Sequence, residues 1–190
     1  TNTYTVRGYA ETILSSNETE QTKALVRAML VYGGAAQECF KYNTNNLAST
    51  GFENNAVVST EVNNIVSKDD IAGLSFYGAS LSYRNKTAVR FYFTGDTTGM
   101  TFTANSEDVT IGTKNEMTYI EVANINPQNL GDAIEVVVTA EDGKTLTVAY
   151  SPLNYIVRMY TKAGSSEKTK LLAQALYGYY QAALAYMPKN

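Results

Sequence analysis

Apolar residues recur with helical spacing at both ends of the chain and with a period of two in the middle. Residues 19–42 carry an apolar stripe at spacings of three and four, which indicates one amphipathic helix. A shorter stripe over residues 6–14 precedes it, and the brief link between them predicts an antiparallel hairpin. We expect Thr5 to cap the short helix, and Asn17 with Glu20 to form a capping box for the long one.

The C-terminal end has the same arrangement. Ser151 followed by Pro152 is a helix-start signal, since proline suits the first helical position. A short apolar stripe, a Gly-Ser-Ser break and a longer stripe over residues 171–186 follow. The sequence therefore predicts one α-hairpin at residues 1–43 and another at residues 151–190.

The two hairpins match each other as an internal repeat. At an offset of 146, Thr5 corresponds to Ser151 and Tyr9 to Tyr155. The shared order of short helix, loop, Thr-Lys and long helix favours a true repeat over a chance match of two similar helices. At an offset of 147, the long helices align Thr22-Lys23 with Thr169-Lys170, Leu25 with Leu172, Ala28 with Ala175, Tyr32 with Tyr179, and Ala35-Ala36 with Ala182-Ala183.

Glycines interrupt both long helical patterns, at Gly33-Gly34 and Gly178. Each costs about 1 kcal/mol relative to alanine inside a helix, so a close approach of another chain segment is expected there. We expect these glycines to mark the crossing of the two long helices; a ligand groove is the alternative. If Gly34 lies at the helix crossing, Gly34→Ala should lower the stability of the protein. If Gly34 faces solvent or an open groove, the same substitution should raise it.

Residues 71–150 alternate apolar and polar positions in six or seven short runs separated by turn signals. This spacing is typical of an antiparallel sandwich. Residues 125–131 are expected to form a strand-to-strand corner, and residues 44–70 a long crossover with room for one strand. The predicted fold is α+β: an antiparallel, Ig-like β-sandwich flanked by two α-hairpins that pack together, with residues 1–190 forming a single compact unit.

The residue types present exclude several kinds of catalytic chemistry. The chain has no histidine and one cysteine, which removes Ser-His-Asp and Cys-His nucleophiles and zinc sites built from histidine or several cysteines. Cys39 lies on an apolar helical stripe, so an inert core thiol is expected rather than a reactive one. No glycine-rich phosphate loop occurs. We therefore expect no catalytic residue, no cofactor and no metal.

Pairs of adjacent acids are the remaining acid–base option. They lie beside predicted turns, where solvated surface is the usual role. A glycosidase would need two carboxyls about 5–10 Å apart in a cleft, and a calcium site would need clustered oxygens; both stay open as alternatives. The pairs are Asp69-Asp70, Glu107-Asp108 and Glu141-Asp142.

Charge and hydropathy argue against two kinds of partner, nucleic acids and the membrane interior. The net charge is −3 and no basic run occurs, so we expect no nucleic-acid partner. No apolar stretch reaches the roughly 18 residues of a membrane span, so we expect no membrane insertion. The chain opens in polar sequence without a signal peptide, which predicts a segment of a longer protein.

Tyrosines in the stranded region are candidates for sugar contact. Tyr92 lies on the strand face opposite Phe91 and Phe93, where it is expected to face solvent. A row of exposed tyrosines could stack on pyranose rings, unless the helical arms cover that face. The candidate ligand-binding residues are Tyr77, Tyr83, Tyr92 and Tyr119.

Four segments carry a family resemblance: residues 4–9 (YTVRGY), 25–37 (LVRAMLVYGGAAQ), 76–81 (FYGASL) and 150–155 (YSPLNY). They resemble modules of large extracellular proteins from anaerobic Gram-positive gut and rumen bacteria, and the resemblance spans nearly the whole chain. It implies a secreted or cell-surface location and a non-catalytic accessory role. It carries over no functional residues.

The function expected from these observations is that of a non-catalytic accessory module serving adhesion, spacing or protein contact. The alternative is a carbohydrate-binding module for plant or host glycans, and the third candidate is an enzyme with a carboxylate pair. The expected partners are other modules of the same polypeptide, a glycan or a cell-surface protein.

Overall fold

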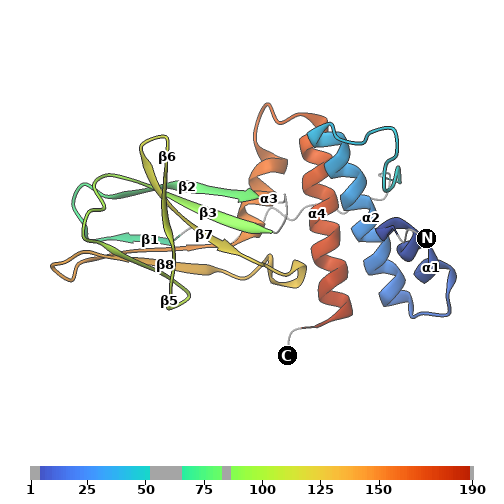
Figure 1. Ribbon diagram of the computed structural model, residues 1–190, viewed down its shortest axis with the longest axis horizontal. Coiled ribbons are helices and arrows are strands. Elements are labelled where there is room, and N and C mark those ends of the chain that lie inside the picture. Colours follow the sequence, from blue (N-terminus) through green and yellow to red (C-terminus); the bar gives the residue numbers. More distant parts are fainter. Residues whose placement is uncertain (1–4, 52–65, 83–86, 189–190) are drawn as a thin grey trace. The chain divides into compact units, whose positions relative to one another are not determined.

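The computed structural model describes residues 5–51, 66–82 and 87–188, and the chain contacts divide it into two compact units (Figure 1). The helical unit combines both ends of the chain, Thr1–Thr60 and Ile156–Asn190, and the β unit is Glu61–Tyr155. The α+β class is confirmed. Residues 1–190 were expected to form a single compact unit; the chain contacts separate two, and the helices and the sheets each have a buried cluster of their own.

Helices form at both ends, as predicted. They are α1 (Val6–Ser15), α2 (Glu20–Phe40), α3 (Pro152–Thr161) and α4 (Glu167–Tyr186). Thr5 caps α1 by accepting a hydrogen bond from the Gly8 N–H at 3.0 Å. The predicted capping box at Asn17 is wrong, because α2 begins later and Thr19 is its N-cap.

The internal repeat extends to the details of the helix ends. α1 and α3 each span 10 residues and begin 146 residues apart, and α2 and α4 begin 147 residues apart. The Thr19 and Ser166 hydroxyls each accept a hydrogen bond from the backbone N–H three residues later, both at 3.2 Å. At the ends of α1 and α3, the Ser15 and Thr161 hydroxyls each donate to the carbonyl four residues earlier, both at 2.8 Å.

In the helical unit, α2 and α4 pack side by side and antiparallel (Figure 1). Lys168, at the start of α4, forms a 2.6 Å ion pair with Glu38 near the end of α2. The repeat-equivalent Tyr32 and Tyr179 rings stack on each other, with centroids 5.8 Å apart. The prediction that the two hairpins pack together is confirmed. The buried core of this contact is Ala35, Ala36, Leu172 and Ala175.

Gly34 has a different neighbour from the one predicted. A Cβ built on Gly34 would lie 2.2 Å from the carbonyl oxygen of Ser49, and one on Gly33 would lie 3.1 Å from the Cβ of Ala48. The close approach is therefore made by the segment that follows α2. Lys41, with a φ of 56°, ends α2 in the left-handed region and turns the chain back along the helix.

Gln37 holds this returning segment in place. Its side chain is buried, with 6% exposed, and its Nε2 donates to the carbonyls of Asn43 at 3.2 Å and Asn46 at 3.0 Å. Its Oε1 accepts from the Ala48 N–H at 2.7 Å. A buried amide with its donors and acceptor satisfied makes this loop a fixed part of the helical unit.

The β unit contains two antiparallel sheets, with strand orders β1-β9-β8-β4-β5 and β2-β3-β7-β6. The first and last strands are neighbours, which differs from the order of constant-type immunoglobulin domains. Val109 lies between β5 and β6. The strands are β1 (Val66–Asp69), β2 (Ser75–Ser82), β3 (Ala88–Thr94), β4 (Thr101–Ala104), β5 (Glu107–Asp108), β6 (Ile111–Lys114), β7 (Met117–Ala123), β8 (Ile134–Thr139) and β9 (Thr145–Tyr150).

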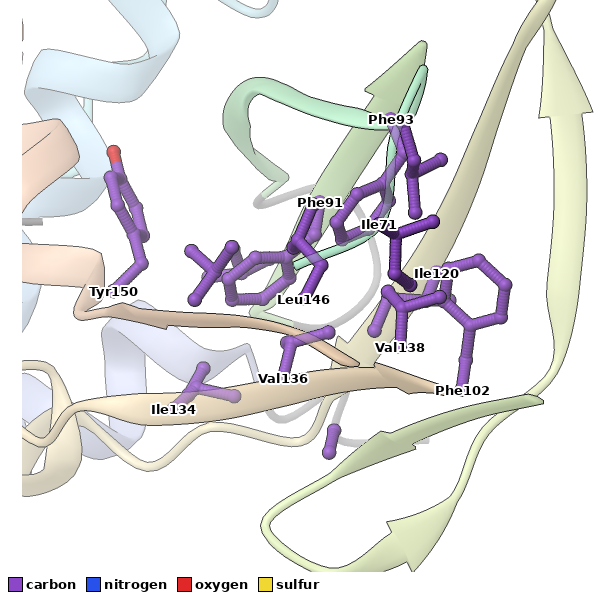
Figure 2. Close-up of a cluster of buried hydrophobic side chains, with 14 residues drawn as sticks. Ile71, Phe91, Phe93, Phe102, Ile120, Ile134, Val136, Val138, Leu146 and Tyr150 are labelled. Atoms are coloured by element: carbon purple, nitrogen blue, oxygen red, sulfur yellow. The ribbon is translucent and has the colours of Figure 1, made fainter. Parts of the chain in front are cut away.

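Both sheets contribute to one buried hydrophobic cluster, which Figure 2 shows. The Phe93 ring from β3 meets the Phe102 ring from β4 edge to face, with centroids 5.5 Å apart. Phe91 and Val136, from opposite sheets, are fully buried. The predicted alternation in β3 is confirmed, since Phe91 and Phe93 are buried and Tyr92 between them is not. The predicted corner contains a short 3₁₀ turn, Pro127–Asn129.

Candidate functional site

The outward face of β3 and β7 carries two cross-strand pairs of functional side chains. Arg90 is paired with Glu121, and Tyr92 with Tyr119. These four alternate with residues such as Phe91 that are buried in the core, so the pleat of the strands directs them away from it. The Tyr92 and Tyr119 ring centroids are 5.9 Å apart.

Arg90 and Glu121 form a half-buried ion pair. The Arg90 Nε lies 2.6 Å from the Glu121 Oε2, and the two side chains are 34% and 26% exposed. The hydrogen bond that the Arg90 guanidinium donates to Glu121 raises the pKa of Arg90 above its ordinary value. The guanidinium carbon also lies 5.0 Å from the centroid of the Tyr119 ring, a cation–π geometry. The pair is therefore a fixed, charged feature of this face.

The Tyr119 ring lies across Gly112 on the neighbouring strand β6. A Cβ at Gly112 would come within 2.5 Å of the ring carbon that bears the hydroxyl. Because Gly112, the cross-strand partner of Tyr119, has no side chain, the tyrosine ring can pack directly on the Gly112 backbone. Tyr119 is thus held between Gly112 and Arg90, and does not offer an open stacking face.

A groove of about 470 Å³ runs along this face. Charged, hydroxyl and apolar groups meet in it, which suits a polar ligand that also has apolar faces. Ile111 on its rim is 44% exposed. The lining residues are Arg90, Val109, Thr110, Ile111, Gly112, Tyr119, Glu121 and Ala123.

The structure brings two of the four candidate tyrosines together. Tyr92 and Tyr119 are in contact, and the Tyr92 hydroxyl accepts from the Ser80 Oγ at 3.3 Å. Tyr77 is 70% exposed at a bulge in the strand β2, next to Gly78, which is the cross-strand partner of Tyr92. Tyr83 lies outside the described residues.

Sequence reasoning missed Arg90 and Glu121. The period-two pattern already placed Arg90 on the same strand face as Tyr92, and Glu121 on the same face as Tyr119. What the pattern could not supply is the register that sets Arg90 opposite Glu121.

Glu141 and Asp142, one of the predicted acid pairs, line a groove of about 320 Å³ together with Thr98 and Lys144. Asp142 forms a 2.5 Å ion pair with Lys144, and hydrogen bonds from Lys144 hold the Asp142 pKa below its usual value. Glu141 occupies the space that a Cβ on Gly99 would need. Asp69 and Asp108 lie outside the described side chains. Among the described residues, no three His, Cys, Asp or Glu side chains gather as a metal site would require.

The single thiol, Cys39, is partly buried against the α2–α4 contact. That position agrees with a packing role.

No protein-family model, no curated protein and no solved structure matches this chain. Among the helices described, none combines the length and apolar character needed to cross a membrane.

Proposed function

We propose that this chain is a non-catalytic accessory module of a secreted or cell-surface bacterial protein, and that its β unit binds carbohydrate in the groove beside Tyr119. The extracellular, accessory role rests on the resemblance of segments such as residues 25–37 and 76–81 to modules of large bacterial surface proteins. The binding role rests on the groove itself.

The observation that carries the binding proposal is the Arg90–Glu121 pair placed beside an aromatic ring in an open groove. Sugar hydroxyls both donate and accept hydrogen bonds, so a guanidinium donor next to a carboxylate acceptor matches two neighbouring hydroxyls. Ile111, which is 44% exposed, and Val109 beside it supply apolar surface for the C–H groups of a pyranose.

The same groove supports binding without catalysis. Glycoside hydrolysis usually needs two carboxyl groups flanking the bond. Glu121 is the sole carboxylate among the lining residues described, and it is paired with Arg90.

The test is binding of the full chain to an array of plant and host glycans, followed by titration calorimetry with the glycan retained. Glu121→Gln should weaken binding about tenfold or more, since a hydrogen bond to a charged group contributes about 1.5–3 kcal/mol. Glu135→Gln is the matched control, because Glu135 is an exposed glutamate on β8 in the other sheet.

Two results would overturn the proposal. If no glycan is retained by the wild-type chain, carbohydrate binding is wrong. If Glu121→Gln and Glu135→Gln bind equally well, the groove is not the site.

A further inference from the structure

Two large apolar side chains are exposed in the first turns of α1. Val6 is 74% exposed and Tyr9 is 65% exposed, whereas the next residue, Ala10, is buried at 1%. α1 therefore buries one face within the helical unit and presents apolar groups on another.

The repeat-equivalent turn of α3 is covered. Ser151, the equivalent of Thr5, is 4% exposed, and Pro152, the equivalent of Val6, is buried. Tyr155, the equivalent of Tyr9, packs against the core between the two sheets. The Leu153 N–H donates to the carbonyl of Leu130 at 2.8 Å. The residues up to Tyr155 thus belong to the β unit.

The two turns have the same local structure. The Gly8 N–H donates to the Thr5 hydroxyl at 3.0 Å, and the equivalent Asn154 N–H donates to the Ser151 hydroxyl at 3.3 Å. Because the backbone and the tyrosine are alike, the exposure of the α1 turn reflects what packs on it. In α3 that neighbour is the end of a β unit. In α1 the Arg7 guanidinium donates to the Asn46 Oδ1 and the Leu47 carbonyl, while Val6 and Tyr9 stay exposed.

We infer that the Thr5–Tyr9 turn is a docking surface for the end of a β unit built like residues 61–155. Val6 and Tyr9 take the places of Pro152 and Tyr155 against that unit's apolar end. The occupant is identified by the repeat, which shows the same turn in its covered state.

One backbone group fits this assignment. The Arg7 N–H is equivalent to the Leu153 N–H, and the described residues offer it no backbone acceptor. A docked β unit would supply a carbonyl equivalent to that of Leu130.

The test exchanges the turns within the full chain. In the α1-turn graft, the α3 turn receives the α1 sequence, and Tyr155 stays. If the α1 turn is built to dock on a β unit, this graft keeps the sheet amides protected from hydrogen exchange and lowers the melting temperature by a few degrees at most. The graft consists of Ser151→Thr, Pro152→Val, Leu153→Arg and Asn154→Gly.

A matched control grafts the first turn of α2, residues 19–23, at the same place. That turn is capped by a hydroxyl in the same way but has no apolar residue at the two docking positions. This α2-turn graft should lose protection at the end of the β unit. It consists of Ser151→Thr, Pro152→Glu, Leu153→Gln, Asn154→Thr and Tyr155→Lys.

Equal disruption by the two grafts would overturn the inference, because the α1 turn would then have no particular fit to a β unit. A second measurement tests whether a second copy of the chain occupies the surface instead. If light scattering shows a dimer of the wild-type chain that Tyr9→Ser dissociates, the surface serves a second copy and the inference is wrong. A monomer whose α1-turn graft stays folded supports it.

Discussion

At the scale of single residues, Gly34 shows how one hydrogen atom decides the packing of a helix. A methyl group there would lie 2.2 Å from the carbonyl oxygen of Ser49, and that backbone cannot easily retreat because Gln37 holds the loop by three hydrogen bonds. Gly34→Ala should lower the free energy of unfolding by about 1–3 kcal/mol, the cost of overpacking, despite the helix propensity of alanine. Urea denaturation measures this change.

Gly33→Ala is the control for this prediction. Its added methyl group meets the Ala48 methyl group at 3.1 Å rather than a backbone oxygen, so the loss should be smaller than at Gly34. A higher free energy of unfolding for Gly34→Ala than for the wild type would contradict the close contact with Ser49.

At the scale of secondary-structure elements, the long helices start with the same cap. Thr19 in α2 and Ser166 in α4 each accept an N–H at 3.2 Å, and both hydroxyls are exposed. Thr19→Ala and Ser166→Ala should each reduce the free energy of unfolding of the helical unit by about 1 kcal/mol. Chemical denaturation followed by circular dichroism at 222 nm provides the measurement.

Thr12→Ala serves as the matched control for the caps. The Thr12 hydroxyl donates to the carbonyl of Gly8 inside α1, a bond that adds little to helix stability. This variant should be neutral or slightly stabilising, because alanine has the higher helix propensity. Equal losses in all three variants would mean that the caps contribute nothing specific.

At the scale of the whole molecule, the division into units predicts the effect of truncation. Removing residues 162–190 takes away α4 and exposes the face of α2 that carries Ala35 and Ala36. Because most helical stability in proteins comes from packing of an apolar face, α2 should lose its protection from hydrogen exchange as well. The amides of Phe91 and Val136 should stay protected, since the β unit ends at Tyr155.

Retained protection of α2 after this truncation would show that the α1–α2 hairpin is stable without α4. Loss of protection at Phe91 and Val136 would show that the β unit depends on the helical unit. The first result would contradict the dependence of α2 on α4, and the second would contradict two separately closed cores.

The sequence by itself determined the local features. The cap at Thr5 and the alternation around Phe91 depend on residues within a few positions of each other, and the matching of the two hairpins can be read from the residue order. The lack of histidine alone excludes Ser-His-Asp nucleophiles and histidine-ligated zinc. In the candidate site, the pattern placed Tyr92 and Tyr119 on outward strand faces.

Only the tertiary structure decided what each of these faces meets. It placed Ser49 rather than α4 over Gly34, set Arg90 opposite Glu121, and covered the turn at Tyr155 while leaving that at Tyr9 exposed. The physical reason is that periodicity fixes which side of a helix or strand is apolar, because it follows the backbone repeat. The partner for that side comes from residues distant in sequence, and its choice depends on register, loop path and packing that no local pattern encodes.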